Sequence, residues 1–542
     1  MPLLAALAIA SVTLSSIPAA GAPQHDHAAA TEKLGTVSFT VSCGPAAQIQ
    51  FNRALALLHS FEFQRALDGF AATLEADPAC GMAEWGIALS RWSNPFAAGQ
   101  RPSAALQQGR AAIDRARAIG LKTARERAYV DAAACLYADT DTVPQSARMA
   151  AYRDAMARVA AAYPNDREAS IFYALSLAAA AAPTDKTYAD QKKAGAILER
   201  LIAAQPDHPG LAHYIIHAYD APPLADRALD AARRYARIAP AAPHALHMPS
   251  HTFTRLGQWQ DSIDTNLKSG EVARREGATA EELHTMDYRV YAYLQTGQDD
   301  AARQLLNALP EVRSRFDPNA IGSAAPGSAG VFALAAIPAR YALERGDWSA
   351  AARLDVYASA FPYTEALTYF ARALGASRTK DPATARTAIA ALDDIERRLT
   401  DAKEPYWAGQ TRIQREAAAA WLALAEGRRD DAVTAMRAAV ALEDATEKSA
   451  VTPGPLAPAR ELLGEMLMEL GQPADARLEF EATMKKEPNR FRAVNGAARA
   501  AAAMGDDVAA RRYQAQLLAI CARSDTPGRP ELVAARQSAG RR

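Results

Sequence analysis

Residues 460–489 read RELLGEMLMELGQPADARLEFEATMKKEPN, and this stretch decides the fold. Gly471 marks a turn between two helical segments, and Pro488 ends the second of them. A small residue at Gly464 lets the two helices cross closely, while Phe480 fills the gap to the next unit. The spacing is that of a helix-turn-helix unit of about 34 residues, which predicts a repeat.

The same signature recurs along the chain. It is carried by turn glycines, small residues at the crossing, aromatics and helix-ending prolines: Ala54, Ala66, Phe70 and Pro78, then Gly257, Gly297, Gly346, Gly427 with Ala432, Ala476 and Gly505. This pattern resembles the tetratricopeptide repeat (TPR) superfamily over about residues 44–523. The resemblance implies an all-α, right-handed superhelical solenoid of antiparallel helix hairpins.

Composition agrees with a helical array and argues against some functions. The 542 residues are 50% hydrophobic but only 7% aromatic, and much of the hydrophobic fraction is alanine, the best helix former. The 61 basic and 61 acidic side chains balance, so we expect no nucleic-acid partner. Gly-rich phosphate loops, GxSxG elbows and CxxC motifs are absent from the sequence, which removes the usual support for nucleotide, serine-hydrolase or thiol-redox chemistry.

The two ends of the chain predict export and flexibility. Residues 1–22 combine a short apolar stretch with an A-x-A pattern ending at Ala22, which predicts a secretory signal peptide and a periplasmic or secreted protein. This stretch is shorter than the roughly 20 residues that span a bilayer, and no later one is long enough, so no integral membrane segment is expected. Residues 23–43 are expected to form a flexible leader. Residues 524–542, rich in Pro, Gly and Arg, are expected to form a disordered tail.

Export permits disulfides, and two cysteines are candidates for one. Cys43 precedes the first expected helix and Cys80 opens the third, and these two helix starts are neighbours in a stacked array. A Cys43–Cys80 bridge and a pair of buried free thiols both remain open, because sequence alone does not fix connectivity.

A closer resemblance is to one family of exported bacterial TPR proteins. It is carried by the segments FNR (51–53), LLHSF (57–61), AHY (212–214), HAYD (217–220), HMPSH (247–251), His284 with MDY (286–288), TPGP (452–455) and PARE (458–461). That family has no assigned reaction. The resemblance therefore implies a fold and a compartment rather than a chemistry.

Seven of the ten histidines lie between His208 and His284. In TPR units the first helix lines a concave groove through its positions 2, 5, 9 and 12, and the superfamily resemblance transfers this register to the present chain. Counting from Pro240, Gly257 and Gly297 places the following side chains in the groove: His213, His217 and Asp220, then His244, His247 and His251, then His284, Asp287 and Tyr291. His208 falls outside this register and is expected to be a cap or loop residue.

The histidine spacing predicts a metal site. His213 and His217, like His247 and His251, are four residues apart, so their Cβ atoms lie about 5–6 Å apart on one helix face. Neighbouring helices pack about 8–10 Å apart, so the two pairs can face one site. Imidazole suits Zn, Cu or Fe. The expected ligands are His213, His217, His247, His251 and His284, with Asp220 or Asp287 as a further ligand or as a group that orients an imidazole.

Other polar side chains at groove positions are candidates for binding a ligand: His244, His59, Tyr173, Tyr291, Arg340, Glu461, Arg492, Asn495 and Arg499. Among them Arg492, Asn495 and Arg499 have the chemistry of a carboxylate clamp. Residues 451–458 contain three prolines and a glycine, which predicts a shaped loop. Pro249 and Pro338 are expected to kink their helices.

The leading hypothesis is an exported TPR protein whose groove holds a transition metal together with a peptide, protein or small-molecule ligand. One alternative is a metal-free interaction scaffold of the cell envelope, and another is a metal-free enzyme or small-molecule binder. A third is a metal-dependent enzyme with Asp220 or Asp287 as base. The sequence leaves open whether the protein is an enzyme.

Overall fold

The computed structural model describes residues 32–320 and 324–540, so the predicted signal peptide lies outside the described residues. The described residues form 26 α-helices and two short 3₁₀ helices and contain no strand, which confirms the all-α prediction. Within these ranges no helix combines the length and apolar character needed to cross a bilayer.

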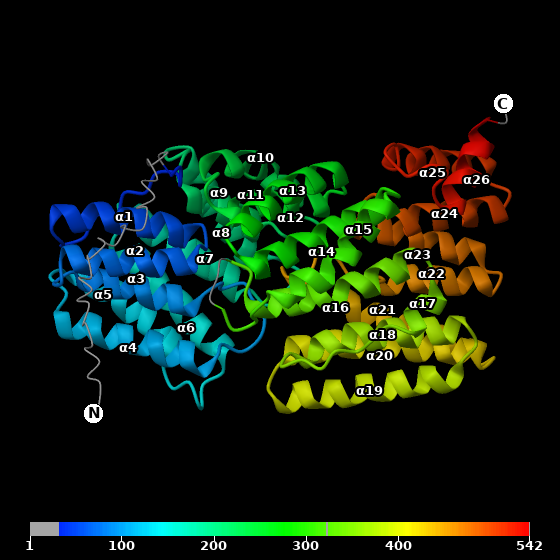
Figure 1. The fold of residues 1–542 in the computed structure, drawn as a ribbon, viewed down its shortest axis with the longest axis horizontal. Coiled ribbons are helices and arrows are strands. Elements are labelled where there is room, and N and C mark those ends of the chain that lie inside the picture. Colours follow the sequence, from blue (N-terminus) through cyan, green and yellow to red (C-terminus); the bar gives the residue numbers. More distant parts are fainter. Residues whose placement is uncertain (1–31, 321–323, 541–542) are drawn as a thin grey trace, which may run out of the picture.

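The first helices form one end of an elongated molecule (Figure 1). They are α1 (Pro45–His59), α2 (Phe63–Ala76), α3 (Gly81–Trp92), α4 (Ser103–Ile119), α5 (Ala124–Ala134), the 3₁₀ helix η1 (Cys135–Tyr137), α6 (Gln145–Ala162), α7 (Arg167–Ala180) and α8 (Ala189–Ile202).

The central helices follow, coloured green in Figure 1. They are α9 (Pro209–Ala218), the 3₁₀ helix η2 (Ala225–Ala228), α10 (Leu229–Ile238), α11 (Pro243–His247), α12 (Pro249–Arg255), α13 (Trp259–Arg275), α14 (Thr279–Gln295), α15 (Asp299–Ser314) and α16 (Gly327–Glu344).

The remaining helices build the other end (Figure 1). They are α17 (Trp348–Ala352), α18 (Pro362–Arg378), α19 (Pro382–Asp401), α20 (Pro405–Ala425), α21 (Arg429–Asp444), α22 (Ala459–Glu469), α23 (Pro473–Lys486), α24 (Phe491–Ala503), α25 (Asp507–Ile520) and α26 (Pro530–Gly540).

Consecutive helices pack as hairpins, and each hairpin packs on the next, which is the arrangement of a TPR-like solenoid. The predicted turn glycines permit these hairpins. Gly257 and Gly471, for example, have φ of +64° and +74°, a conformation that side chains with a Cβ disfavour. At the first of these turns the Gln258 N–H donates to the Phe253 carbonyl at 2.8 Å and closes the end of α12.

The small residues of the signature face the aromatic ones. A Cβ added to Gly464 or Gly496 would come within 2.7 or 2.5 Å of the Phe480 ring, so this ring fills the space between α22 and α24. In the first hairpins Phe70 of α2 lies against Gly86 of α3 in the same way. The close helix crossing therefore depends on glycine at these positions.

Replacing Gly86 by alanine should destabilise the protein, because the new Cβ would meet the Phe70 ring at 2.3 Å. Overpacking of this kind costs about 1–3 kcal/mol. Gly409 is the matched control: it is also helical, but nothing lies within 4 Å of its added Cβ. Gly409→Ala should be neutral or stabilising by up to about 1 kcal/mol. Urea unfolding of both variants measures the difference, and equal effects would contradict the packing argument.

The C-terminal helices pack back on the middle of the chain. The Trp259 indole N–H donates to the Asn489 carbonyl at 2.8 Å, and the Phe491 N–H donates to the Gln295 side chain at 2.9 Å. The loop between α21 and α22 also reaches the first helices, since Lys186 pairs with Glu447 at 2.7 Å. The central helices are therefore covered, and the concave face predicted as an open groove is largely buried.

The structure corrects the predicted flexible leader for residues 32–43. These residues are extended, and the side chains of Leu34, Val37, Phe39 and Val41 are buried. The Phe39 ring packs 5.1–5.9 Å from the rings of Phe51, Trp85 and Tyr129. This apolar side of the segment completes the core of the first hairpins, which holds it in place.

The structure also corrects the predicted disordered tail for residues 524–540. Residues 530–540 form α26, and Leu532 is fully buried. Arg529 pairs with Asp299 at 2.6 Å and donates to the Leu294 carbonyl at 3.0 Å. The composition of the tail resembles that of a disordered segment, but these contacts tie it to α14 and α15.

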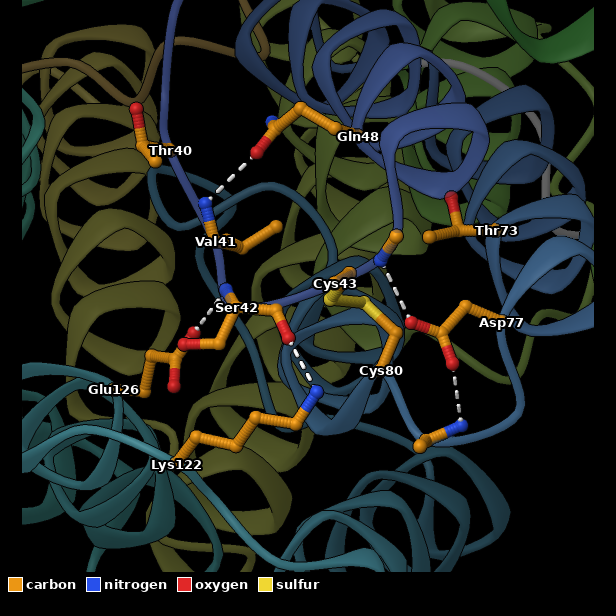
Figure 2. The surroundings of a disulfide bond; sticks show 12 residues. Thr40, Val41, Ser42, Cys43, Gln48, Thr73, Asp77, Cys80, Lys122 and Glu126 are labelled. Atoms are coloured by element: carbon orange, nitrogen blue, oxygen red, sulfur yellow. Dashed lines mark hydrogen bonds between the residues drawn. A yellow bond between two sulfur atoms is a disulfide. The ribbon is translucent and has the colours of Figure 1, made fainter.

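Cys43 and Cys80 are joined by a disulfide, with their Cα atoms 5.0 Å apart (Figure 2). The bridge links the extended segment before α1 to the start of α3. Side chains from other elements hold the same backbone: Gln48 accepts from the Val41 N–H, Glu126 from the Ser42 N–H and Asp77 from the Gly44 N–H. The start of the solenoid is thus fastened by covalent and hydrogen bonds together.

Candidate metal centre

Six histidines from four central helices form two neighbouring groups. The first trio is His213 and His217 of α9 with His244 of α11, and the second trio is His247 of α11, His251 of α12 and His284 of α14. Within each trio the three candidate ligand nitrogens lie within 4.8 Å of one another. The sequence predicted one site for most of these residues, whereas the structure divides them between two.

The division does not fall at Pro249. This residue begins α12, yet His247 and His251 on either side of it belong to the same trio. His244 and His247 lie on α11 but belong to different trios, and their ring centroids are 5.8 Å apart. The boundary between the two groups therefore lies within α11, between His244 and His247.

In the first trio two imidazole nitrogens face each other at a short distance. The Nδ1–H of His213 donates to the His59 carbonyl at 2.7 Å, so its Nε2 carries a lone pair. His244 directs Nδ1 toward the Glu281 carboxylate at 3.4 Å, and in the tautomer with the proton on Nδ1 its Nε2 also carries a lone pair. The two Nε2 atoms are 3.2 Å apart. Two facing lone pairs at this distance repel unless a cation lies between them.

The second trio repeats this arrangement. The Nδ1–H of His247 donates to Asn266 Oδ1 at 2.6 Å, and Asn266 Nδ2 donates to the Ser262 carbonyl, which fixes Oδ1 as the acceptor. The Nδ1–H of His251 donates to Asp220 at 3.0 Å. The Nε2 atoms of His247 and His251 are consequently both unprotonated, and they are 3.1 Å apart.

The third histidine of each trio has a buried nitrogen without a partner. His217 Nε2 and His284 Nδ1 are inaccessible and make no hydrogen bond within the described structure. Buried polar groups are nearly always satisfied in folded proteins, so each unpaired nitrogen is available to a ligand such as a metal ion. One such nitrogen in each trio, together with one facing pair in each, makes three available donors per group.

The electrostatics favour neutral imidazoles. Burial lowers the pKa of all six histidines below its ordinary value, and for His247 it lowers the pKa to about 3. The imidazolium form is therefore disfavoured in both trios near neutral pH. Neutral imidazole is the form that binds metal ions.

The two trios share one small cavity. His217 and His251 come from different trios, and their ring centroids are 6.0 Å apart. A cavity of about 40 Å³ lies beside them, lined by two histidines of each trio: His217, His244, His251 and His284. A ligand in this cavity would lie against imidazoles of both trios.

The two predicted carboxylates belong to neither trio. Asp220 accepts from His251 Nδ1 and pairs with Arg255 at 2.8 Å, so it orients an imidazole rather than joining the ligand groups. Burial alone would raise the pKa of Asp220, but the cations of Lys448 and Arg255 hold it well below its usual range. Asp287 lies elsewhere: it forms a buried ion pair with Arg340 at 3.0 Å.

Several predicted groove residues form a buried polar network instead of an open surface. Arg340 donates to the Gly454 and Pro455 carbonyls and so fastens the proline-rich loop. Glu461 pairs with Arg490 at 2.7 Å, and Arg490 also donates to the Tyr291 hydroxyl at 3.2 Å.

The predicted carboxylate clamp is already occupied by carboxylates of the chain itself. Arg492 lies 3.3 Å from Glu461, and Arg499 lies 3.2 Å from Glu465. Asn495 is half-buried on the same helix, α24, and Tyr173 is half-buried on α7 with the Lys193 ammonium 5.4 Å from its ring.

His59 and the unpredicted pair Glu168 and His208 form a third group, which has a carboxylate at its centre and in which His208 Nδ1 is buried without a partner. His59 Nε2 and His208 Nε2 donate to the two Glu168 oxygens at 3.0 and 2.9 Å, and His59 Nδ1 lies 3.0 Å from the Tyr214 hydroxyl. One carboxylate thus satisfies two N–H donors. His208 is the residue immediately before α9, which agrees with the expected cap position. Its side chain is buried.

Sequence reasoning missed the groups that orient the imidazoles. Asn266 lies on the second helix of its hairpin, Glu281 lies in the first turn of α14, and the His59 oxygen belongs to the backbone. The spacing of residues in the sequence does not identify any of these three groups. Their roles depend on contacts between helices, which only the folded chain reveals.

Comparisons with known proteins do not assign a function. No family model matches the chain. No curated protein matches it either. Among solved structures, a human IFIT1 dimer with m7Gppp-AAAA gives a TM-score of 0.35 at 10% identity, covering 86% of this chain and 95% of IFIT1. A monomeric IFIT1 mutant with m7Gppp-AAAA gives 0.35 and 10%, covering 88% and 97%. Similarity at this level carries no conclusion about what the present chain binds.

Proposed function

We propose that this TPR-like protein is a metalloprotein whose function depends on two transition-metal ions, one in each histidine trio. The observation that carries the proposal is the pair of Nε2–Nε2 contacts at 3.2 and 3.1 Å between imidazoles whose Nδ1 atoms face oxygen atoms. Three protein ligands leave a metal with an open position, as in catalytic sites, whereas structural zinc sites are closed by four. The proposed centre therefore binds a further ligand.

The chemistry of the donors narrows the choice of metal. Each trio offers three neutral imidazoles and no carboxylate or thiolate. Such a set suits Zn, Cu or Fe, and among divalent ions copper binds nitrogen ligands most tightly. Asp220, Asn266 and the His59 carbonyl fix the tautomers, which is the usual role of groups behind metal-binding histidines.

A metal-free scaffold is less well supported. In that case protein groups would have to satisfy the buried imidazole nitrogens, and His217 Nε2 and His284 Nδ1 have no such partner in the described structure. The polar groove residues expected to hold a peptide are paired within the chain.

We also propose that the protein is exported to the periplasm or secreted. The signal-like residues 1–22 support this location. The Cys43–Cys80 disulfide supports it as well, because such bonds persist mainly in oxidising compartments.

Elemental analysis of the purified full chain tests the metal proposal. We expect about two transition-metal ions per chain, one for each trio. The His213→Ala/His217→Ala variant should retain only the ion of the second trio, and His251→Ala/His284→Ala only that of the first. His208→Gln, outside both trios, should retain both. The absence of bound metal, with no binding of Zn, Cu or Fe by the stripped protein in calorimetry, would refute the proposal.

Asn266→Ala should weaken metal binding in the second trio alone, because it frees the Nδ1–H of His247 from its acceptor. Loss of such an orienting group lowers metal affinity by about 10–100-fold. Competition with a chelator measures the effect, and Asn495→Ala on α24 is the control with the same chemical change. An unaltered affinity for both ions would show that Asn266 does not orient a metal ligand.

A further inference from the structure

We propose that the small cavity beside the trios is a dioxygen site, with the gas held between two copper(I) ions. This inference rests on the proposed dinuclear centre and adds the identity of the metal and of its ligand. Its basis is the shared cavity: His217 and His244 of the first trio and His251 and His284 of the second all line it. A molecule bound there would lie against histidines of both trios.

The size of the cavity limits the ligand to a few atoms. Its volume is about 40 Å³, and one water needs roughly 10–15 Å³ on this measure. A hydrolytic centre would need room for its substrate as well as for the attacking water. A peptide, sugar or nucleotide would have to remain in the larger pocket that adjoins this space, whereas a diatomic molecule fits beside the histidines.

The walls of the cavity favour a neutral and apolar ligand. Apart from the histidines, they consist mainly of apolar and aromatic side chains: Phe96, Ala97, Ala98, Ala324, Ala325, Pro326, Ala329, Tyr363, Trp407 and Val451. No Lys or Arg side chain lines the cavity to balance an anion. Phe96 also stacks on the His217 ring at 4.0 Å and shields that imidazole.

An access route and a second apolar space lie next to the cavity. A larger pocket of about 320 Å³ shares Phe96, His217 and Ser449 with it and provides a path for a small molecule. On another side, Phe61 packs 4.4 Å from the His213 ring and lines an apolar cavity of about 30 Å³. Apolar cavities stay free of water and admit gases such as xenon.

The donor set is compatible with the electron transfer that dioxygen binding requires. Each copper(I) ion gives up one electron and becomes copper(II), and dioxygen accepts both electrons and is held at the level of peroxide. The O–O bond is weakened but not broken, and no proton is taken up. Release reverses the transfer, so no other reductant is needed. Neutral imidazoles coordinate copper in both oxidation states.

Stripped full-length protein loaded with copper(I) under argon provides the test. We expect two copper ions and one dioxygen taken up per chain, with a new near-ultraviolet absorption band that disappears under vacuum. Carbon monoxide, which binds copper(I) but not copper(II), should block the uptake. Ala329→Leu should fill part of the cavity and lower oxygen uptake by about tenfold at unchanged copper content. Ala335→Leu on the same helix, outside the lining, should have no effect.

The outcomes separate the two proposals. Failure to bind two copper ions would overturn the dinuclear centre and this inference with it. Normal copper binding without oxygen uptake would overturn the dioxygen site alone. If Ala329→Leu does not fold, competition by carbon monoxide on the unmodified protein decides: uptake that carbon monoxide does not block would place the oxygen reaction outside the cavity.

Discussion

Removal of the metal should lower the free energy of unfolding by about 4 kcal/mol for each ion. This value applies when the free metal concentration is a thousand times the dissociation constant of the site. The ligands of the two trios come from α9, α11, α12 and α14, and only the folded chain brings them together. Metal ions therefore bind the native state in preference to the unfolded one. Removal also restores the repulsion between facing imidazole nitrogens at 3.1–3.2 Å.

Urea unfolding with and without added metal, after chelation and dialysis, measures this loss. The His217→Ala/His284→Ala variant removes one ligand from each trio and should lose most of the stabilisation by metal. The control is His208→Gln, which should respond to metal as the unmodified chain does. Equal stabilisation of His217→Ala/His284→Ala and the unmodified protein would show that the ions bind outside the trios.

The repeat was predictable from sequence because its determinants are local. Gly257 and Gly471 allow the tight turns, and Phe480 fills the space that Gly464 leaves open. These residues lie within one unit of each other, so their spacing is visible in the chain. The all-α, TPR-like fold follows from such local rules applied many times.

The closure of the array was not predictable in the same way. Trp259 and Asn489 meet across 230 residues, and Lys186 meets Glu447 across 261. Repeat spacing carries no information about such contacts. For this reason the concave positions were expected to be open, whereas the structure covers them and buries the histidines.

The candidate site shows the same contrast. The i,i+4 spacing identified His213 with His217 and His247 with His251, because helix geometry is local. Register assigned His244 to the groove, but its separation from His247 into another trio depends on the imidazoles that α9, α12 and α14 bring near α11. Asp287 was expected beside the metal because of its position in the repeat register. In the structure it pairs instead with Arg340, which lies 53 residues further along the chain.

Asp287→Ala should lower the free energy of unfolding by about 3–5 kcal/mol while leaving both metal ions in place. Arg340 is fully buried, and Asp287 is its ionic partner through two contacts at 3.0 and 3.3 Å. Without the carboxylate, a guanidinium charge remains in the interior without its counter-charge, which is strongly destabilising. The proline-rich loop should loosen as well, because the same guanidinium donates to the Gly454 and Pro455 carbonyls.

The double variant Asp287→Ala/Arg340→Met separates the ion pair from a role in metal binding. Removing both charges should recover part of the stability lost in Asp287→Ala, since replacing a buried ion pair by apolar groups is often close to neutral. Recovery should be incomplete because Met lacks the hydrogen bonds of Arg340 to the loop. Urea unfolding and metal analysis of the two variants provide the measurements. Loss of one metal ion in Asp287→Ala, restored by Asp287→Glu, would instead make this carboxylate a ligand, as its register in the sequence predicts.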